Sequence, residues 1–268
     1  MQTIPACNNC RDRAPLPFEF SMAFQPIVDV VRDRVWAYEA LVRGPKGEPA
    51  WSILSRIDDE NRYRFDQAAR VKAITLAARL FGDGDAKLSI NFMPNAVYEP
   101  SACIRASLAA AANTGFAPDR LIFEFTEGEQ LDVDHVKRII KEYKRHGMMT
   151  AIDDFGSGYS GLNLLARFQP DVIKLDMELI RGIAESRSRR AIVSGVLATA
   201  HALDITVVAE GVETLDELMT LRDAGVSLFQ GYLLAKPSFE SLPEVIVPPE
   251  AMQGSAAVAR ERLGHIVG

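Results

Sequence analysis

The 268-residue sequence predicts one α/β domain, a modified (β/α)8 barrel of the TIM type whose first strand is antiparallel. Eight strand-like apolar segments occur, and from the second onward they alternate with segments of helical periodicity, which is typical of a mostly parallel sheet. A short polar turn joins the first two, which is typical of an antiparallel pair. Eight strands favour a closed barrel over an open doubly wound sheet, and the chain length is usual for such a barrel.

The predicted strands are short runs rich in β-branched and aromatic residues, bounded by polar residues, glycine or proline. In chain order they cover residues 18–27, 35–42, 87–92, 121–125, 148–152, 172–175, 205–209 and 228–234. The polar segment 29–34 separates the first two strands, and a second polar loop, 44–49, follows them. The first pair therefore forms a hairpin, and the later strands are separated by helices.

The predicted helices are longer segments in which apolar residues recur every three or four positions. In chain order they cover residues 59–80, 107–112, 133–143, 162–168, 189–203 and 215–224. The first shows the pattern through Ala68, Val71 and Ile74. The fifth is apolar enough to pack on a barrel without a further partner.

The predicted barrel spans residues 18–246, between two segments without barrel character. Residues 1–17 have no apolar periodicity and form an irregular leader in which Cys7 and Cys10 have C-x-x-C spacing. We favour a flexible leader over a zinc site, because a four-cysteine site would need a second pair, which a dimer could supply. Residues 247–268 begin Val-Pro-Pro-Glu and are interpreted as a C-terminal appendage.

Composition argues against several classes of function. The chain has 30 Lys and Arg against 36 Asp and Glu, a formal net charge of −6, which argues against binding polymeric nucleic acid or an anionic membrane through a basic surface. No segment approaches the roughly 18 uninterrupted apolar residues of a membrane span, so no membrane insertion is expected. The N-terminus does not resemble a signal peptide and three cysteines form no disulfide framework, which favours a cytoplasmic location.

Polar residues gather at the C-terminal ends of the predicted strands. They are Glu39, Asn91, Glu124, Asp153, Asp154, Lys174 and Glu210. If the barrel closes, these side chains converge at one mouth, where five carboxylates repel one another unless they are protonated, paired or bound to metal. Every candidate ligand is an oxygen donor and no histidine falls at a strand end, which favours Mg²⁺ or Mn²⁺ over zinc. Singly, each residue also has a structural interpretation, such as an ion pair for Lys174; the joint pattern favours the metal.

The segment Tyr-Glu-Ala-Leu-Val-Arg at residues 38–43 resembles the signature of the EAL-domain family, bacterial phosphodiesterases that hydrolyse cyclic di-GMP on a modified eight-stranded α/β barrel. Seven further segments resemble motifs of the same family and occur in the same order: residues 25–28, 91–94, 123–127, 153–160, 173–176, 209–213 and 230–232. The resemblance covers residues 18 to 240 approximately, and the ordered set is far more specific than the three-letter signature alone.

The resemblance implies a role for each matching residue. Glu39, Asn91, Glu124 and Asp153 would hold one metal ion, and Asp153 would bridge to a second ion held together with Asp154. Two Mg²⁺ or Mn²⁺ ions are therefore expected. They suit phosphodiester hydrolysis because they lower the pKa of a water and stabilise charge on the attacking and leaving oxygens.

The remaining matches concern the substrate and the attacking water. Lys174 and Glu210 would act with Asp153 at that water, with Glu210 the favoured proton acceptor, although the choice of base between Lys174 and Glu210 stays open. Glu127 matches a residue that steadies the glycine-rich loop after Asp154. The resemblance implies ligand contacts at Arg43, through phosphate, and at Gln230, through the base end, with Gln25 and Leu41 as further candidates.

Departures from the family pattern are small, at Gly44, Ser157 and Gly161, and none removes a ligand. The expected activity is hydrolysis of cyclic di-GMP to linear pGpG. One alternative is a catalytically weak cyclic di-GMP receptor or protein-interaction module on the same fold. Another is a different metal-dependent barrel enzyme, such as an enolate-forming lyase, which the ordered motifs disfavour. A homodimer is expected by resemblance alone.

Overall fold

The structure is a computed structural model, and it describes residues 15–82, 84–126, 132–158 and 161–252. The strands within these residues are β1 (Ser21–Asp29), β2 (Arg34–Arg43), β3 (Lys87–Asn91), β4 (Leu121–Thr126), β5 (Met149–Phe155), β6 (Val172–Leu175), β7 (Thr206–Ala209), β8 (Leu228–Phe229) and β9 (Ser238–Phe239). They form one sheet in the order β2-β3-β4-β5-β6-β7-β8-β1-β9, and β1 also pairs with β2. That last pairing closes β1 to β8 into a barrel, with β9 added at the side of β1.

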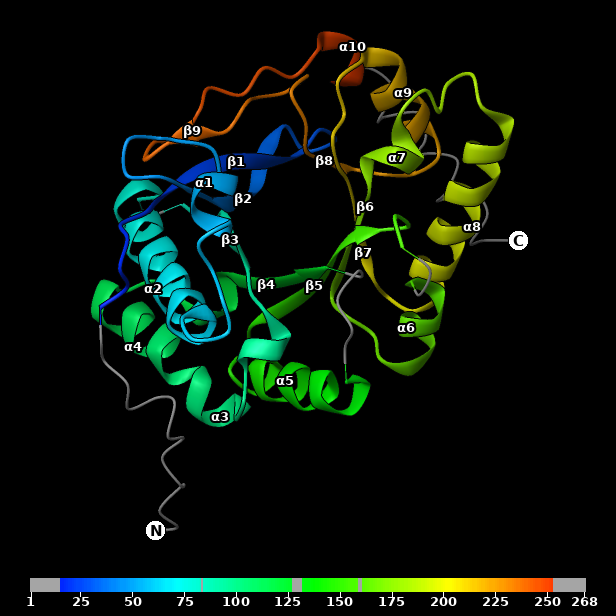
Figure 1. The fold of residues 1–268 in the computed structure, drawn as a ribbon. Helices are drawn as coiled ribbons and strands as arrows, with labels where there is room; N and C mark the ends of the chain where they lie inside the picture. Colours follow the sequence, from blue (N-terminus) through cyan, green and yellow to red (C-terminus); the bar gives the residue numbers. More distant parts are fainter. Residues whose placement is uncertain (1–14, 83, 127–131, 159–160, 253–268) are drawn as a thin grey trace.

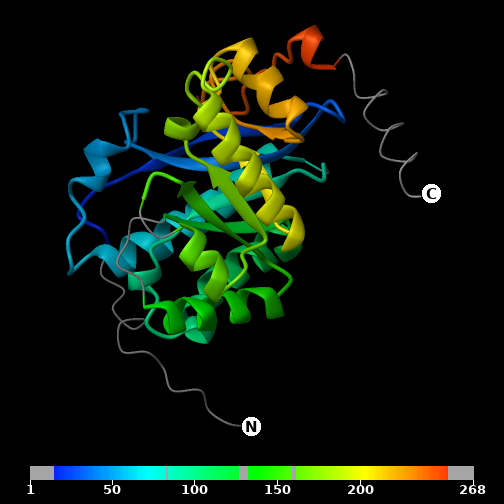
Figure 2. The same cartoon turned by 90° about the vertical axis from the view of Figure 1, so that its right-hand side faces the viewer.

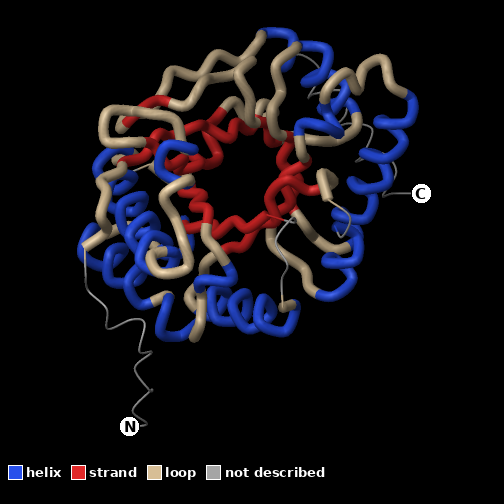
Figure 3. The backbone as a smooth tube through the Cα atoms, viewed as in Figure 1, coloured by secondary structure: helices blue, strands red, loops and turns tan. Residues whose placement is uncertain are grey.

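Helices surround this ring of strands (Figures 1 and 3). They are α1 (Trp51–Leu54), α2 (Arg62–Leu80), α3 (Pro100–Cys103), α4 (Arg105–Thr114), α5 (Val133–Arg145), α6 (Gly161–Arg167), α7 (Met177–Ile180), α8 (Arg187–Ala202), α9 (Leu215–Asp223) and α10 (Pro249–Met252), with 3₁₀ turns at Pro94–Ala96 and Pro118–Arg120. Figure 2 shows the same arrangement from the side. No helix among the described residues is both long and apolar enough to cross a membrane.

The predicted fold class is confirmed, including the antiparallel first strand. β1 runs antiparallel to both β2 and β8, whereas every neighbouring pair from β2 to β8 is parallel. The short β1–β2 turn makes the antiparallel pair possible, because a parallel pair needs a crossover of a dozen or more residues. The helices after β2 supply those crossovers.

The boundaries of several strands differ from the prediction, most at β1 and β8. β1 begins at Ser21 instead of residue 18, because the rings of Phe18 and Phe20 pack on Phe65 of α2, with centroid distances of 6.3 and 5.3 Å. β8 ends at Phe229 instead of residue 234, because the carbonyl of Gln230 accepts from Val212 N, outside the sheet. Aromatic content predicted strand in both places, and tertiary packing overrode it.

Part of the predicted C-terminal appendage packs on the barrel. Just before it, Ile246 N donates to the carbonyl of Leu234 at 3.0 Å; within it, the carbonyls of Glu250 and Ala251 accept from Arg222 of α9, at 3.0 Å each. Ala251 is buried. The boundaries at residues 17 and 246 stay predictions, and Cys7 and Cys10 lie outside the described residues.

The barrel interior is built in layers. One apolar layer contains a residue from each of seven strands: Ile27, Ala37, Ile122, Ala151, Val172, Val208 and Leu228. Side chains on a strand alternate between its two faces, so the residue two positions nearer the mouth points into the same interior. Those next residues are Gln25, Glu39, Glu124, Asp153, Lys174, Glu210 and Gln230. Strand alternation alone therefore places a polar layer directly above an apolar plug.

Candidate active site

Lys174 of β6 is the centre of the polar layer. Its side chain is 1% exposed, and its Nζ lies 2.9 Å from a carboxylate oxygen of Glu124, 3.1 Å from Asp153 and 3.3 Å from Glu39. Glu210 makes a closer contact with the same nitrogen. The predicted convergence of strand-end residues is therefore present, with one ammonium group in contact with four carboxylates from four strands.

Glu39 of β2 is held from two further sides. Asn91 Nδ2 donates to Glu39 Oε1 at 2.8 Å, and Gln230 Nε2 donates to Glu39 Oε2 at 2.8 Å. Gln230 Nε2 also lies 3.3 Å from Gln25 Oε1. Because Asn91 donates through its amide nitrogen, its amide oxygen is the atom available to a cation.

Sequence reasoning missed Ser89 of β3. It is fully buried and its hydroxyl donates to Glu124 Oε1. Ser89 lies two positions before Asn91 on the same strand, so both side chains point into the barrel. The alternation of side chains along β3 was therefore a signal that could have identified Ser89. It was missed because only residues at strand ends were considered.

Burial and mutual repulsion set the ionisation of these groups in the metal-free protein. Burial raises the pKa of Glu124 to about 8. The positive charge of Lys174 lowers this pKa, whereas the negative charges of Glu39 and Asp153 raise it further. Burial, with Asp153 and Glu39 as neighbours, likewise raises the pKa of Glu210 well above its ordinary value. Two carboxyl groups thus retain protons at a higher pH than ordinary glutamates do.

Asp153 and Lys174 show the opposite balance, in which charged partners outweigh burial. Burial opposes the charge on Asp153, but Lys174 and a hydrogen bond from Glu210 lower its pKa. Burial also opposes the charge on Lys174, but Asp153, Glu124 and the other two carboxylates raise its pKa well above the ordinary value. Asp153 and Lys174 therefore form the charged pair within the site.

Asp154 occupies an unusual backbone position directly after Asp153. Its φ angle is +53°, in the left-handed region that non-glycine residues seldom adopt. Burial, with Asp153 and Asp176 as acidic neighbours, raises the pKa of its half-buried side chain to about 6. Asp176, which sequence reasoning did not single out, is buried and caps α7 by accepting from Glu178 N at 2.8 Å. Strain of this kind is typical of functional sites.

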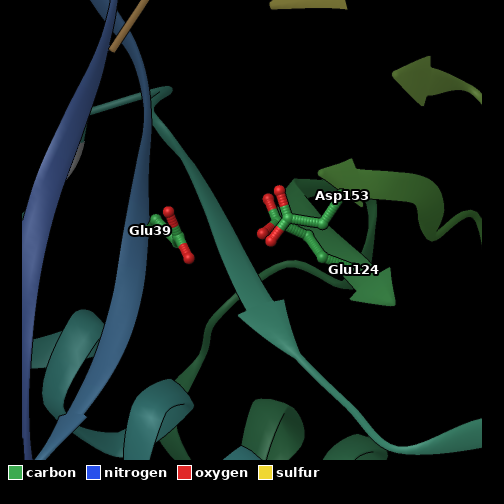
Figure 4. A group of neighbouring side chains, drawn as sticks. All are labelled: Glu39, Glu124 and Asp153. Atoms are coloured by element: carbon green, nitrogen blue, oxygen red, sulfur yellow. The ribbon is translucent and has the colours of Figure 1, made fainter. Parts of the chain in front are cut away.

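The carboxylates fit divalent cations. One group comprises Glu39, Glu124 and Asp153, and a second comprises Asp153, Asp154 and Glu210; in each, one oxygen per residue lies within 4.8 Å of the others. Figure 4 shows Glu124 and Asp153 side by side, facing Glu39. Asp153 belongs to both groups, and its buried Oδ1 lies 3.1 Å from Lys174 Nζ. A carboxylate shared by two acidic groups is what a bridging ligand requires, and the all-oxygen donor set suits Mg²⁺ or Mn²⁺.

Two cavities open onto these carboxylates. The first, of about 460 Å³, is lined by Gln25, Glu39, Asp153, Asp154, Lys174, Asp176, Met177, Glu210, Gly211, Glu213, Gln230, Gly231 and Tyr232. The second, of about 390 Å³, is largely apolar, and its lining includes Leu41, Asn91 and Met93 as well as Glu39 and Asp153. Sequence reasoning missed Met177, which begins the four-residue helix α7, and Glu213 and Tyr232, which lie on loops without strand or helix periodicity.

One predicted residue, Arg43, is not brought to the carboxylates. Arg43 is half-buried at the end of β2, its guanidinium donates to the carbonyl of Val42 at 2.7 Å, and it lines neither cavity. Glu127 lies outside the described residues. Of the other predicted substrate contacts, Gln25 and Gln230 line the first cavity and Leu41 lines the second.

Two curated relatives align with most of this chain. BluF of Escherichia coli K12, a blue light- and temperature-regulated antirepressor, is 36% identical over 227 residues, which are 84% of this chain and 56% of BluF. PdeD of the same organism, a probable cyclic di-GMP phosphodiesterase, is 31% identical over 228 residues, which are 82% of this chain and 42% of PdeD. The chain therefore spans about half the length of these relatives.

Two solved proteins share the fold. A standalone EAL protein from Vibrio cholerae O395 with cyclic di-GMP bound has a TM-score of 0.84 at 53% identity, over 90% of this chain and 100% of that chain. BlrP1 of Klebsiella pneumoniae, in a manganese and cyclic di-GMP complex, has a TM-score of 0.80 at 39% identity, over 88% of this chain and 62% of that chain. The sequence profile of the EAL domain matches residues 13–237. This chain belongs to the EAL domain family.

Proposed function

We propose that this chain hydrolyses cyclic di-GMP to linear pGpG with two bound Mg²⁺ or Mn²⁺ ions. One observation carries the proposal: Asp153 belongs to both clusters of carboxylates that could hold a metal ion. It also lies next to the buried Lys174, which contacts Glu210. The substrate class is supported by the relative named as a cyclic di-GMP phosphodiesterase and by the similar structures that contain cyclic di-GMP.

In this proposal, Glu39, Asn91, Glu124 and Asp153 hold one ion, and Asp153 and Asp154 hold the other. The ions supply Lewis acidity, which lowers the pKa of a water and stabilises negative charge on phosphate oxygens. The five carboxylates of the site and one ammonium carry four formal negative charges when all are ionised. Two divalent cations neutralise that charge, so a dianionic substrate can approach a protein of net charge −6.

Glu210 is the proposed proton acceptor, and Lys174 orients it. In the metal-free site, burial and the neighbouring carboxylates raise the pKa of Glu210 well above its ordinary value. Added positive charge lowers the pKa of a neighbouring acid, so the loaded site would free this carboxylate to accept a proton. Lys174 Nζ contacts both Glu210 and Asp153, and thereby holds the acceptor beside the shared carboxylate.

The two cavities suit a ligand with two base ends. The first has polar amides, from Gln25 and Gln230, and one exposed aromatic ring, from Tyr232. The second has an apolar lining that includes Leu41. We propose that Gln25, Gln230 and Leu41 contact the substrate there. The proposed phosphate contact of Arg43 requires its guanidinium to leave the carbonyl of Val42.

The test is turnover of cyclic di-GMP by the full chain with MnCl₂, with product separated by chromatography. Glu210→Gln and Asp153→Asn keep the size of the side chain, and each is expected to lower the rate by at least about 10²-fold. Asp134→Asn, which removes an exposed carboxylate on α5, is the control and should leave the rate unchanged. Hydrolysis at a near-normal rate in either site variant would refute the role of that residue.

A second candidate is a binding module without hydrolysis, which the relationship to the antirepressor BluF favours. Calorimetry with cyclic di-GMP and MnCl₂ separates the two candidates, since binding without pGpG formation would support the module. A homodimer stays a prediction, which sedimentation of the full chain tests.

A further inference from the structure

The loop that follows Glu210 is fixed by contacts from three directions. Glu210 N donates to the carbonyl of Leu175 at 3.1 Å, which joins β7 to the strand of Lys174. Val212 N donates to the carbonyl of Gln230 at 3.1 Å. The third direction is toward the turn between α7 and α8, where the side chains of Arg181 and of the buried Glu217 make the contacts.

Glu217 of α9 uses both of its carboxylate oxygens. Oε2 accepts from the backbone N of Glu213 at 3.1 Å and of Thr214 at 3.2 Å. Oε1 accepts from Gly182 N at 3.1 Å, in the α7–α8 turn, and lies 3.8 Å from a guanidinium nitrogen of Arg181. The side chain is 4% exposed. Burial by itself would raise the pKa of Glu217, but these hydrogen bonds outweigh it and lower the pKa.

Only part of this arrangement is ordinary helix capping. Thr214 caps α9, and Glu217 completes the reciprocal pair of a capping box. The contacts with Gly182 and Arg181 reach 35 residues back along the chain and have no role in the cap. Arg181 also pairs with Glu213 at 2.9 Å, so two side chains span the same gap.

The turn that Glu217 reaches belongs to the segment that follows Lys174. Four residues of α7 and Arg181 are all that separate Asp176 from Gly182. The Cβ of an alanine at Gly211, directly after Glu210, would lie 2.6 Å from the Cβ of Met177 in α7. The segments after Lys174 and after Glu210 are therefore in direct contact, and Glu217 joins them at the end away from the carboxylates.

We propose that Glu217 is a positioning residue for the reaction, which ties the loop after Glu210 to the α7–α8 turn and so keeps Glu210 against Lys174 and Asp153. This inference rests on the proposed hydrolysis, and it assigns to Glu217 no contact with substrate or metal. A misplacement of about 1 Å at a reacting group can lower a rate by about 10²-fold, so a tie of this kind matters even at a distance.

Glu217→Gln is the decisive variant because it keeps the size of the side chain and removes one acceptor. A glutamine has one amide oxygen, so it can accept on the side of Glu213 and Thr214 or on the side of Gly182, but not on both. Its amide NH₂ then faces backbone N–H donors on the other side. Asp216→Asn is the matched control, because Asp216 is an exposed carboxylate in the same first turn and makes none of these contacts.

The experiment measures two properties of the full chain. The first is backbone hydrogen exchange of the peptides that contain Gly182, Glu213 and Thr214, without substrate. We expect exchange to be about tenfold faster in Glu217→Gln, the effect of losing one such hydrogen bond, and unchanged in Asp216→Asn. The second is steady-state hydrolysis of cyclic di-GMP at saturating MnCl₂. We expect kcat to fall by about 10-fold to 10²-fold with KM within about twofold of the wild type.

The outcomes separate this inference from the proposed function. If the wild type hydrolyses cyclic di-GMP and Glu217→Gln has wild-type kcat, the positioning role is refuted, even if exchange is faster. A kcat that falls equally in Asp216→Asn also refutes it, since general loss of charge would then be the cause. If the wild type shows no hydrolysis, the proposed function fails, and the exchange measurement alone decides whether Glu217 ties the two segments.

Discussion

Proton release is the most direct test of the site in the metal-free protein. A metal ion needs carboxylates, but burial raises the pKa of Glu124 to about 8, so this side chain is about 0.9 protonated at pH 7. Asp154, with a pKa of about 6, is about 0.1 protonated at the same pH. Binding of Mn²⁺ at pH 7 should therefore release about one proton from these two residues, and any proton on Glu210 that is lost adds to it.

The assay is calorimetric titration with MnCl₂ at pH 7 in two buffers of different ionisation enthalpy, which gives the number of protons released. Because protons compete with the metal below pH 8, affinity should rise by about tenfold from pH 6 to pH 7. Glu124→Gln should lower the release by about one proton, whereas Asp134→Asn should not change it. Metal binding that releases no proton and keeps its affinity from pH 6 to pH 7 would refute the raised pKa of Glu124.

Three further changes give separate outcomes. Lys174→Met removes the only ammonium that contacts the four carboxylates in the described part of the chain, and it should abolish hydrolysis. In urea denaturation without metal, its free energy of unfolding should be lower than that of the wild type by about 3–5 kcal/mol. Added MnCl₂ should restore part of this loss. Arg70→Met leaves Asp66 as an unpaired buried charge, which should cost about 3–5 kcal/mol, and an unchanged urea midpoint would contradict this. Gly231→Ala places a Cβ 2.0 Å from the carbonyl oxygen of Val212, so thermal stability and kcat should both fall, while Gly195→Ala, with open space around it, should lose neither.

The metal-free protein should also respond to pH in a defined direction. A carboxyl group with a raised pKa in the folded state holds more protons than in the unfolded chain, so it stabilises the fold at low pH. For Glu124 this contribution is complete below its ordinary pKa of 4.5 and is lost as pH rises through about 8. The thermal midpoint without metal should therefore fall between pH 5 and pH 8, and saturating MnCl₂ should remove the slope. A midpoint that rises over this interval would contradict the assignment.

Much of the site followed from the sequence because strand alternation and strand ends are local properties. Once the barrel closed, Glu39, Glu124 and Asp153 had to share an interior with Lys174. The same logic could have found Ser89. It could not give the contacts of Lys174, since which of the five predicted carboxylates its ammonium reaches depends on side-chain conformation in the packed interior, and Asp154 is the one it does not contact.

Other features were not accessible because they depend on how loops pack. Arg43 fits the family position for a phosphate contact, yet its guanidinium bonds to the neighbouring carbonyl. β8 is short because the chain at Gly231 passes directly against Val212, where a side chain has no room. Glu217 is five positions beyond Val212 and appears in the sequence as an ordinary residue of a first helical turn. Its tertiary contacts only exist once the α7–α8 turn is in place.

Lys174 has a second consequence for how the site would operate. In the metal-free protein its ammonium contacts Glu39, Glu124, Asp153 and Glu210 and offsets the negative charge that these groups carry, and it is buried at considerable cost in solvation. Divalent cations would take over that role, because each brings twice the charge to the same oxygens. Lys174 would then no longer be needed to offset the repulsion among the carboxylates, and its Nζ, still beside Glu210, could also approach an anionic phosphate oxygen or the attacking water. One buried lysine can therefore stabilise the empty site and assist the reaction in the loaded one.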